Sequence, residues 1–129
     1  METKTKAADL MTAVENLGRG ISGSPIAEKY RLCRKNFMND EEAKNLYSNF
    51  MVQQREFQIS QQYNPESEIE HQKIIQLQNE LLANKIFKEY IQAQNSFVDY
   101  LKEINQSISS NLVFDFALYS KPPSKGCCG

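Results

Sequence analysis

Two adjacent cysteines close to the carboxyl terminus are the side chains of this sequence best suited to chemistry. Cys127 and Cys128 stand in the segment Lys121-Pro-Pro-Ser-Lys-Gly-Cys-Cys-Gly. Thiolates are preferred ligands of iron–sulfur clusters and bind zinc well, and a Pro/Gly tether can carry them to another surface. Two thiols do not complete a four-ligand site. Metal binding by this tail therefore needs ligands from elsewhere and predicts an assembly rather than a solitary enzyme.

Two other interpretations of the cysteine pair stay open. One is a tail whose thiols have no role. The other is prenylation, although Cys127 is third from the end, so the four-residue prenylation box is absent. Neighbouring cysteines rarely bridge each other, because the eight-membered ring strains the peptide between them. The three cysteines of the chain therefore do not indicate a secreted disulfide framework.

The remaining residues with chemical potential favour structural roles. Cys33 falls on an apolar helix face, where a free cysteine usually packs as a small hydrophobe rather than as a ligand. His71 is the single histidine, has no second ligand at suitable spacing, and is expected at the surface. The acidic residues at 41–42 and within 66–70 lack a companion nucleophile or base and suit the first turns of helices. We therefore expect no enzymatic activity.

Positive charge is concentrated at one place only. Arg31, Arg34 and Lys35 share a helix face that could contact an acidic partner or RNA, although a solvated face is the commoner outcome. Over the whole chain, 15 Lys and Arg residues balance 16 Asp and Glu residues. Because this balance provides no basic field, direct nucleic-acid binding is not expected.

The composition indicates one all-α domain. The chain has 129 residues, no Trp, only 5 Gly, and apolar residues dominated by Leu, Ile, Phe and Tyr. No segment approaches the roughly 20 apolar residues that span a bilayer, and the amino terminus lacks an apolar signal region. We expect a cytoplasmic protein with a helical domain over residues 1–118 and a flexible Pro/Gly tail over 119–129.

Helix signals in the first half of the chain are clear after residue 23. A weak helical pattern over 3–18 is expected to break at the glycine-rich stretch 18–23. Ser24 then suits an N-cap, with Pro25 at the first helical position. The acidic cluster that follows Asn39 predicts a further helix over 40–62.

The second half is dominated by one long amphipathic helix. Asn64 is expected to cap a helix opened by Pro65, and Asn84 to mark a kink or a recapping point. From there to Leu112, apolar residues recur at spacings of three and four over roughly eight turns. Such a stripe needs an antiparallel neighbour, for which the helix over 40–62 is one candidate.

These elements predict an elongated antiparallel helical bundle with a long carboxyl-terminal helix, completed by dimerisation. The apolar cluster at 112–118 would be a liability if it were exposed on a monomer, so we assign it with the long stripe to a subunit interface. The residues expected there are Phe87, Tyr90, Ile91, Phe97, Leu101, Ile104, Ile108, Phe114 and Phe116.

Two segments, 26–50 and 84–108, resemble the YlbF/YmcA family of bacterial helical regulators, over roughly residues 5–118. Most of the matching positions are helix-packing residues, so their joint order and spacing carry the resemblance. They are Tyr30, the Asp40-Glu41-Glu42-Ala43 turn, Leu46, Phe50, Asn84, Tyr90, Ala93-Gln94, Phe97, Leu101 and Ile104-Asn105.

The resemblance implies an all-helical, often dimeric, non-enzymatic adaptor. In its best-known branch, YlbF and YmcA assemble with YaaT, bind iron–sulfur clusters through cysteines, and direct RNase Y in maturing messenger RNAs, with effects on competence, biofilm formation and sporulation. It therefore implies a paralogue or a second copy, a YaaT-like protein and RNase Y as partners, and a shared cluster at Cys127 and Cys128. This tail departs from the family pattern in holding two cysteines only.

The alternative to the adaptor function is a stand-alone structural homodimer with no metal and an incidental tail.

Overall fold

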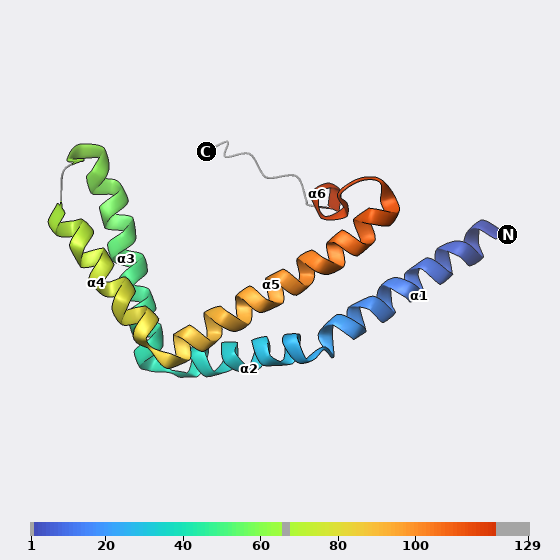
Figure 1. Cartoon of the computed structure of the whole chain (residues 1–129), viewed down its shortest axis with the longest axis horizontal. Helices are drawn as coiled ribbons and strands as arrows, with labels where there is room; N and C mark the ends of the chain where they lie inside the picture. Colours follow the sequence, from blue (N-terminus) through green and yellow to red (C-terminus); the bar gives the residue numbers. More distant parts are fainter. Residues whose placement is uncertain (1, 66–67, 121–129) are drawn as a thin grey trace.

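The computed structural model describes residues 2–65 and 68–120, and the described part is built from α-helices alone. They are α1 (Glu2–Ser22), α2 (Pro25–Asn39), α3 (Glu41–Tyr63), α4 (Glu68–Ala83), α5 (Lys85–Leu112) and the short α6 (Phe116–Ser120). Two limbs meet at a sharp corner (Figure 1): α3 and α4 form an antiparallel hairpin in one, and α2 runs antiparallel to α5 in the other. The predicted elongated all-α architecture is confirmed.

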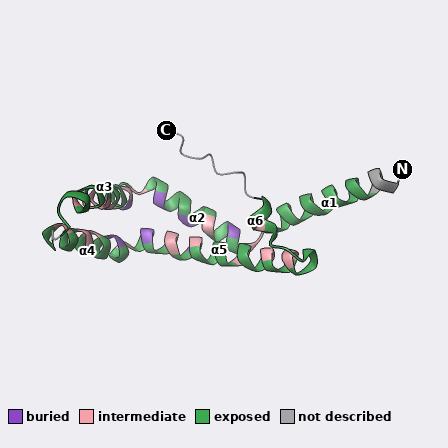
Figure 2. Cartoon of the chain, turned by 90° about the horizontal axis from the view of Figure 1, so that it is seen from above, coloured by how far each residue is buried: buried purple, intermediate pink, exposed green. Residues whose placement is uncertain are grey.

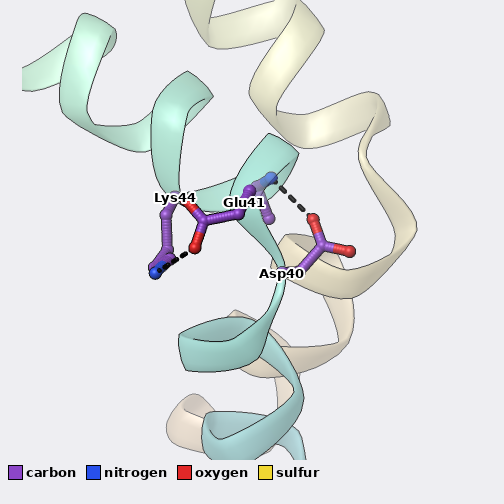
Figure 3. A network of polar contacts seen from close by, with 4 residues as sticks. Asp40, Glu41 and Lys44 are labelled. Atoms are coloured by element: carbon purple, nitrogen blue, oxygen red, sulfur yellow. Dashed lines mark hydrogen bonds and ion pairs between the residues drawn. The ribbon is translucent and has the colours of Figure 1, made fainter.

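Side-chain caps fix where three of the helices begin. Ser24, Asp40 and Asn84 each accept a hydrogen bond from the backbone N–H three residues ahead, at 3.3, 2.8 and 3.0 Å. Such a cap satisfies an amide that has no partner within the helix. At the α2–α3 corner, an ion pair of 2.9 Å between Lys44 and Glu41 follows the Asp40 cap (Figure 3). Single residues thus separate α2 from α3 and α4 from α5, and they make sharp corners.

Two predicted boundaries are wrong. The first helix does not break at Gly18 but continues to Ser22, because helical glycine costs only about 1 kcal/mol. Its end is closed by the Gly23 N–H, 2.9 Å from the Arg19 carbonyl oxygen. Asn64 does not cap the following helix. It ends α3, donating its N–H to the Ser60 carbonyl oxygen at 2.7 Å, and α4 is described from Glu68.

The long helix also has a different neighbour from the one proposed for it. The helix over 40–62 was a candidate, but α5 packs chiefly on α2, while α3 packs on α4. The reason lies in the two single-residue corners, which turn α3 and α4 away together and leave α2 alongside α5 (Figure 1).

The core lies where the two limbs meet. Phe37, Ala43, Leu81 and Phe87 come from four different helices and are all buried. Figure 2 shows buried residues at this corner and along the α2–α5 contact only. Cys33 is also buried, as the apolar-face interpretation predicted.

A ladder of stacked aromatic rings extends this core along α2 and α5. Phe97 stacks on Tyr30 at 5.2 Å between ring centroids, Tyr30 on Tyr90 at 6.1 Å, and Tyr90 on Phe37 at 5.0 Å. Stacked pairs of this kind add about 0.5–1.5 kcal/mol each beyond the apolar area that they bury. The ladder therefore explains why α2 is the partner of α5.

Candidate partner-binding surface

An open apolar groove lies beyond the end of the aromatic ladder, between α1 and the carboxyl-terminal end of α5 with α6. Its volume is about 670 Å³. Figure 1 shows α1 and the α5–α6 end as its two flanks. Nearly all of its lining is apolar. A large exposed apolar surface on a protein usually marks a site where another molecule binds. It is lined by Leu10, Ala13, Val14, Leu17, Ile108, Leu112, Phe114, Phe116, Tyr119 and Ser120.

The α1 wall is an amphipathic helix with little support from its own chain. Its large apolar side chains before Ile21 range from 42% exposed at Leu17 to 64% at Leu10, and every residue from Lys6 to Gly20 is exposed (Figure 2). The helix is held at its carboxyl end, where the Arg31 guanidinium donates to the Ser22 carbonyl oxygen at 2.6 Å. Helices in water gain most of their stability from burying an apolar face. We therefore expect the exposed apolar face of α1 to be covered by another protein surface.

The opposite wall is held in place by polar side chains of α5. The Asn105 amide oxygen accepts the Ala117 N–H at 3.0 Å, and the Ser109 hydroxyl accepts the Phe116 N–H at 3.0 Å. Asn105 also donates to the Asp115 carboxylate at 3.3 Å. These bonds fold α6 back on α5 and satisfy amides at the start of a helix too short to satisfy them itself.

A strained turn connects α5 to α6. Val113 ends α5 in the left-handed region, at φ 65° and ψ 5°, and its side chain is 99% exposed. A β-branched residue is disfavoured there, and such strain persists only where the surroundings enforce it. Beyond the turn, Phe114 and Tyr119 meet edge to face at 5.4 Å. The turn thus presents an aromatic cluster to the groove.

The structure divides the predicted interface residues into two groups along α5. Phe87, Tyr90, Ile91 and Phe97 pack within the chain, against the core or the ladder. Leu101 and Ile104 lie between the ladder and the groove. Only Ile108, Phe114 and Phe116 line the groove itself.

The α1 wall was missed as an interface by the sequence reasoning. The sequence does carry a signal for the α1 wall, because apolar residues recur there at helical spacing: Leu10, Met11, Val14 and Leu17. Without knowledge of the neighbouring helices, this pattern is interpreted as a helix face that packs weakly in the core. The recurrence gives the face, but it does not tell whether the chain itself covers that face.

The predicted basic residues lie together on α2, and one of them also supports the fold. Arg31 is engaged with Ser22 at the α1–α2 junction, where it serves the fold. Arg31, Arg34 and Lys35 are all exposed, and together with Met38 they line one shallow hollow. Nothing in this geometry singles the hollow out as a nucleic-acid site.

No metal site forms among the described residues. Cys127 and Cys128, the predicted ligands, lie outside them. Within 2–65 and 68–120, no three His, Cys, Asp or Glu side chains gather closely enough to hold an ion. Cys33 is buried, and His71 is exposed and stacks on Phe57 at 5.8 Å.

One ionisable group inside the aromatic ladder is perturbed. Burial, aided by a hydrogen bond and charge from the neighbouring Tyr30 hydroxyl, raises the pKa of the Tyr90 phenol above its ordinary value of 10.0. The shift follows from the packing of Tyr90 against Tyr30 of α2, so it reports the integrity of the ladder.

None of the described helices is both long and apolar enough to cross a bilayer.

A comparison with curated protein sequences gives no match. Among solved structures, the chain is similar to one described as the X-ray crystal structure of Bacillus subtilis RicA in complex with RicF. The TM-score is 0.73 at 25% sequence identity, over 82% of this chain and 95% of that one.

The family comparison covers most of the chain. Residues 10–113 match the family model described as "Control of competence regulator ComK, YlbF/YmcA". That range runs from the α1 wall of the groove to the turn after α5. This match confirms the family resemblance that the sequence analysis inferred from the helix-packing residues. The chain belongs to the YlbF/YmcA family.

Proposed function

We propose that this protein is a non-enzymatic regulatory adaptor that works by binding other helical protein chains through the groove between α1 and α5–α6. The observation that carries the proposal is the groove itself, an apolar surface open to solvent on a chain of balanced charge. Apolar surfaces of this kind on soluble proteins are typical of protein–protein contacts.

The comparisons support the same conclusion. The family is one of regulators, and RicA, which is similar over 82% of this chain, was crystallised in a complex with RicF. We therefore propose a YlbF/YmcA relative as a partner, with the groove as the contact surface.

The finer part of the proposal concerns the pathway and the tail. Following the family resemblance, we propose a YaaT-like protein as a further partner and RNase Y-dependent messenger RNA maturation as the process affected. Competence, biofilm formation and sporulation would then be the developmental states that respond. Cys127 and Cys128 would supply two thiolate ligands to an iron–sulfur cluster completed by the partners.

Co-purification with a family relative tests the adaptor function. Phe116→Asp places a charge in the groove, 44% exposed in the free chain, and is expected to abolish binding. Ile69→Asp on α4 is the matched control, because Ile69 is 73% exposed and lies on the other limb. Both variants should keep wild-type helicity by circular dichroism. Equal binding by both would reject the groove as the contact surface.

Anaerobic co-purification tests the tail separately. Iron, acid-labile sulfide and zinc are assayed in the complex formed by wild type and by the Cys127→Ser/Cys128→Ser variant. Iron and sulfide in wild type, lost in the variant, would support a shared cluster. A metal-free homodimer that recruits no partner and is unchanged by the substitutions would favour the stand-alone structural alternative.

A further inference from the structure

We infer that the basic hollow on α2 is a docking site for an acidic helical segment of another protein. The hollow has a volume of about 190 Å³ and is lined by Arg31, Arg34, Lys35 and Met38. It shares no lining residue with the apolar groove between α1 and α5–α6. The inference therefore goes beyond the proposed function and does not depend on it, because it gives the chain a second binding surface for a partner of different chemistry.

Positive charge is concentrated on α2 although the whole chain is nearly neutral. This helix carries four Lys and Arg residues against a single acid, Glu28. Among the side chains that the structure describes, none of the three cations of the hollow forms an ion pair. None of them lies in the last turn of α2, where the helix dipole favours a cation. Like charges three and four residues apart on a helix repel one another, and a bound carboxylate would relieve that repulsion.

The fold holds the hollow in place before any partner binds. Stacked Tyr30 and buried Phe37 fix α2 against α5 through a different face of the helix. The Arg31 guanidinium is also anchored, since it donates to the Ser22 carbonyl oxygen at 2.6 Å. A guanidinium has five N–H donors, so several remain for a carboxylate. A surface that is ordered in advance loses little conformational freedom on binding.

The spacing of the four side chains matches an acidic helix. Arg34 and Lys35 follow Arg31 at three and four residues, and Met38 follows at seven, so the hollow extends over about 10 Å. Carboxylates three or four residues apart on a second helix lie at a similar spacing, and arginine can pair with them through two parallel hydrogen bonds. Met38 is 48% exposed and offers contact to an apolar residue beside those acids.

These side chains suit a protein better than a nucleic acid. Arginine and methionine are enriched in protein–protein interfaces. Binding to nucleic acid strengthens with the number of phosphates neutralised, and the hollow offers three cations on a chain of net charge -1. Single strands are also bound by aromatic rings that stack on the bases, but Tyr30 and Phe37 of α2 already stack within the ladder.

Fluorescence anisotropy with a designed peptide is the test. The probe is a fluorescein-labelled, lactam-stapled helix with glutamates at spacings of three and four and a leucine one turn away. In the full-length protein, Arg34→Glu/Lys35→Glu should raise the dissociation constant at least ~10-fold. Lys88→Glu/Lys102→Glu is the matched control, because it reverses two exposed cations of α5 and changes the net charge equally. Wild type that does not bind, or equal weakening by both variants, would overturn the inference.

A charge-reversed probe separates lost contacts from lost folding. The same peptide with lysines in place of its glutamates should bind Arg34→Glu/Lys35→Glu more tightly than wild type, a gain that an unfolded variant cannot give. No such gain would overturn the inference. So would a single-stranded RNA oligonucleotide that binds wild type more tightly than the acidic peptide does.

The groove variant keeps this inference and the proposed function distinguishable. Phe116→Asp should bind the acidic peptide like wild type, whereas Arg34→Glu/Lys35→Glu should still co-purify with a family relative. Wild type that binds the relative but not the peptide would overturn this inference alone. Loss of peptide binding in Phe116→Asp would show that the two surfaces are not separate and would also overturn it.

Discussion

Replacing Phe37 by alanine is the sharpest test of the packing described above. Phe37 is 6% exposed and contacts the rings of Tyr90, Phe87 and Tyr47 at centroid distances of 5.0, 5.9 and 5.9 Å. Removing such a ring loses its transfer free energy and leaves a cavity, which together cost about 3–5 kcal/mol. We expect about 4 kcal/mol, because residues from three other helices pack around the ring and cannot all close the gap.

A second substitution separates the ring contacts from the apolar volume. Phe37→Leu keeps most of the volume but removes three aromatic pairs, so we expect a loss of about 2 kcal/mol. Phe57→Ala serves as the comparison outside this core. Phe57 is half-buried and stacks on the exposed His71, so its loss should cost about 1 kcal/mol.

The assay is urea unfolding followed by circular dichroism, run at two protein concentrations so that any dimer contribution is recognised. At this chain length, 4 kcal/mol lowers the melting temperature by roughly 15 °C. A cost below about 1 kcal/mol for Phe37→Ala would refute the corner core. Equal costs for Phe37→Ala and Phe37→Leu would instead refute the contribution assigned to stacking.

Three further substitutions probe local features of the fold. Asp40→Ala removes the cap of α3 and should cost about 1 kcal/mol in the same unfolding assay, whereas Asp40→Asn should cost less because the amide oxygen can still accept the bond. Val113→Asn relieves the left-handed strain at an exposed site and should raise stability by about 1 kcal/mol; a loss would mean that the turn does not have this geometry. Tyr90→Phe tests the raised pKa of the phenol. Because the proton is held more tightly in the folded chain, this group leaves stability unchanged below pH 10.0 and lowers it as pH rises above that value. The variant should therefore show a smaller fall in melting temperature at alkaline pH than wild type, and identical alkaline profiles would contradict the shift.

Local signals in the sequence determined most of the helices and the family. Ser24 was predicted as an N-cap, Asn84 as a kink or a recapping point, and the acidic cluster after Asn39 as a helix start. These signals are readable because capping depends on residues three positions apart, which the sequence displays directly. The long helix to Leu112 followed in the same way from its apolar period. The break expected at Gly18 failed because a modest propensity cost does not by itself end a helix.

The pairing of the helices was decided only in three dimensions. An apolar period says that a face will be covered, but it does not say by which helix, and both α2 and α3 offered faces to α5. The single-residue corners at Asp40 and Asn84 settled the choice by setting the direction in which the chain leaves each helix. As a result, Phe87 and Tyr90, expected at a subunit interface, are used within the chain.

The groove could be found only from the tertiary structure, because its walls are nearly a hundred residues apart in the sequence. Leu10 and Val14 form one side and Phe114 and Phe116 the other, and neither pair predicts the other's position. Sequence by itself determined the family, the helices and which faces are apolar. The fold decided which of those faces the chain covers and which it leaves for a partner, since that depends on long-range packing and on where the corners direct each helix.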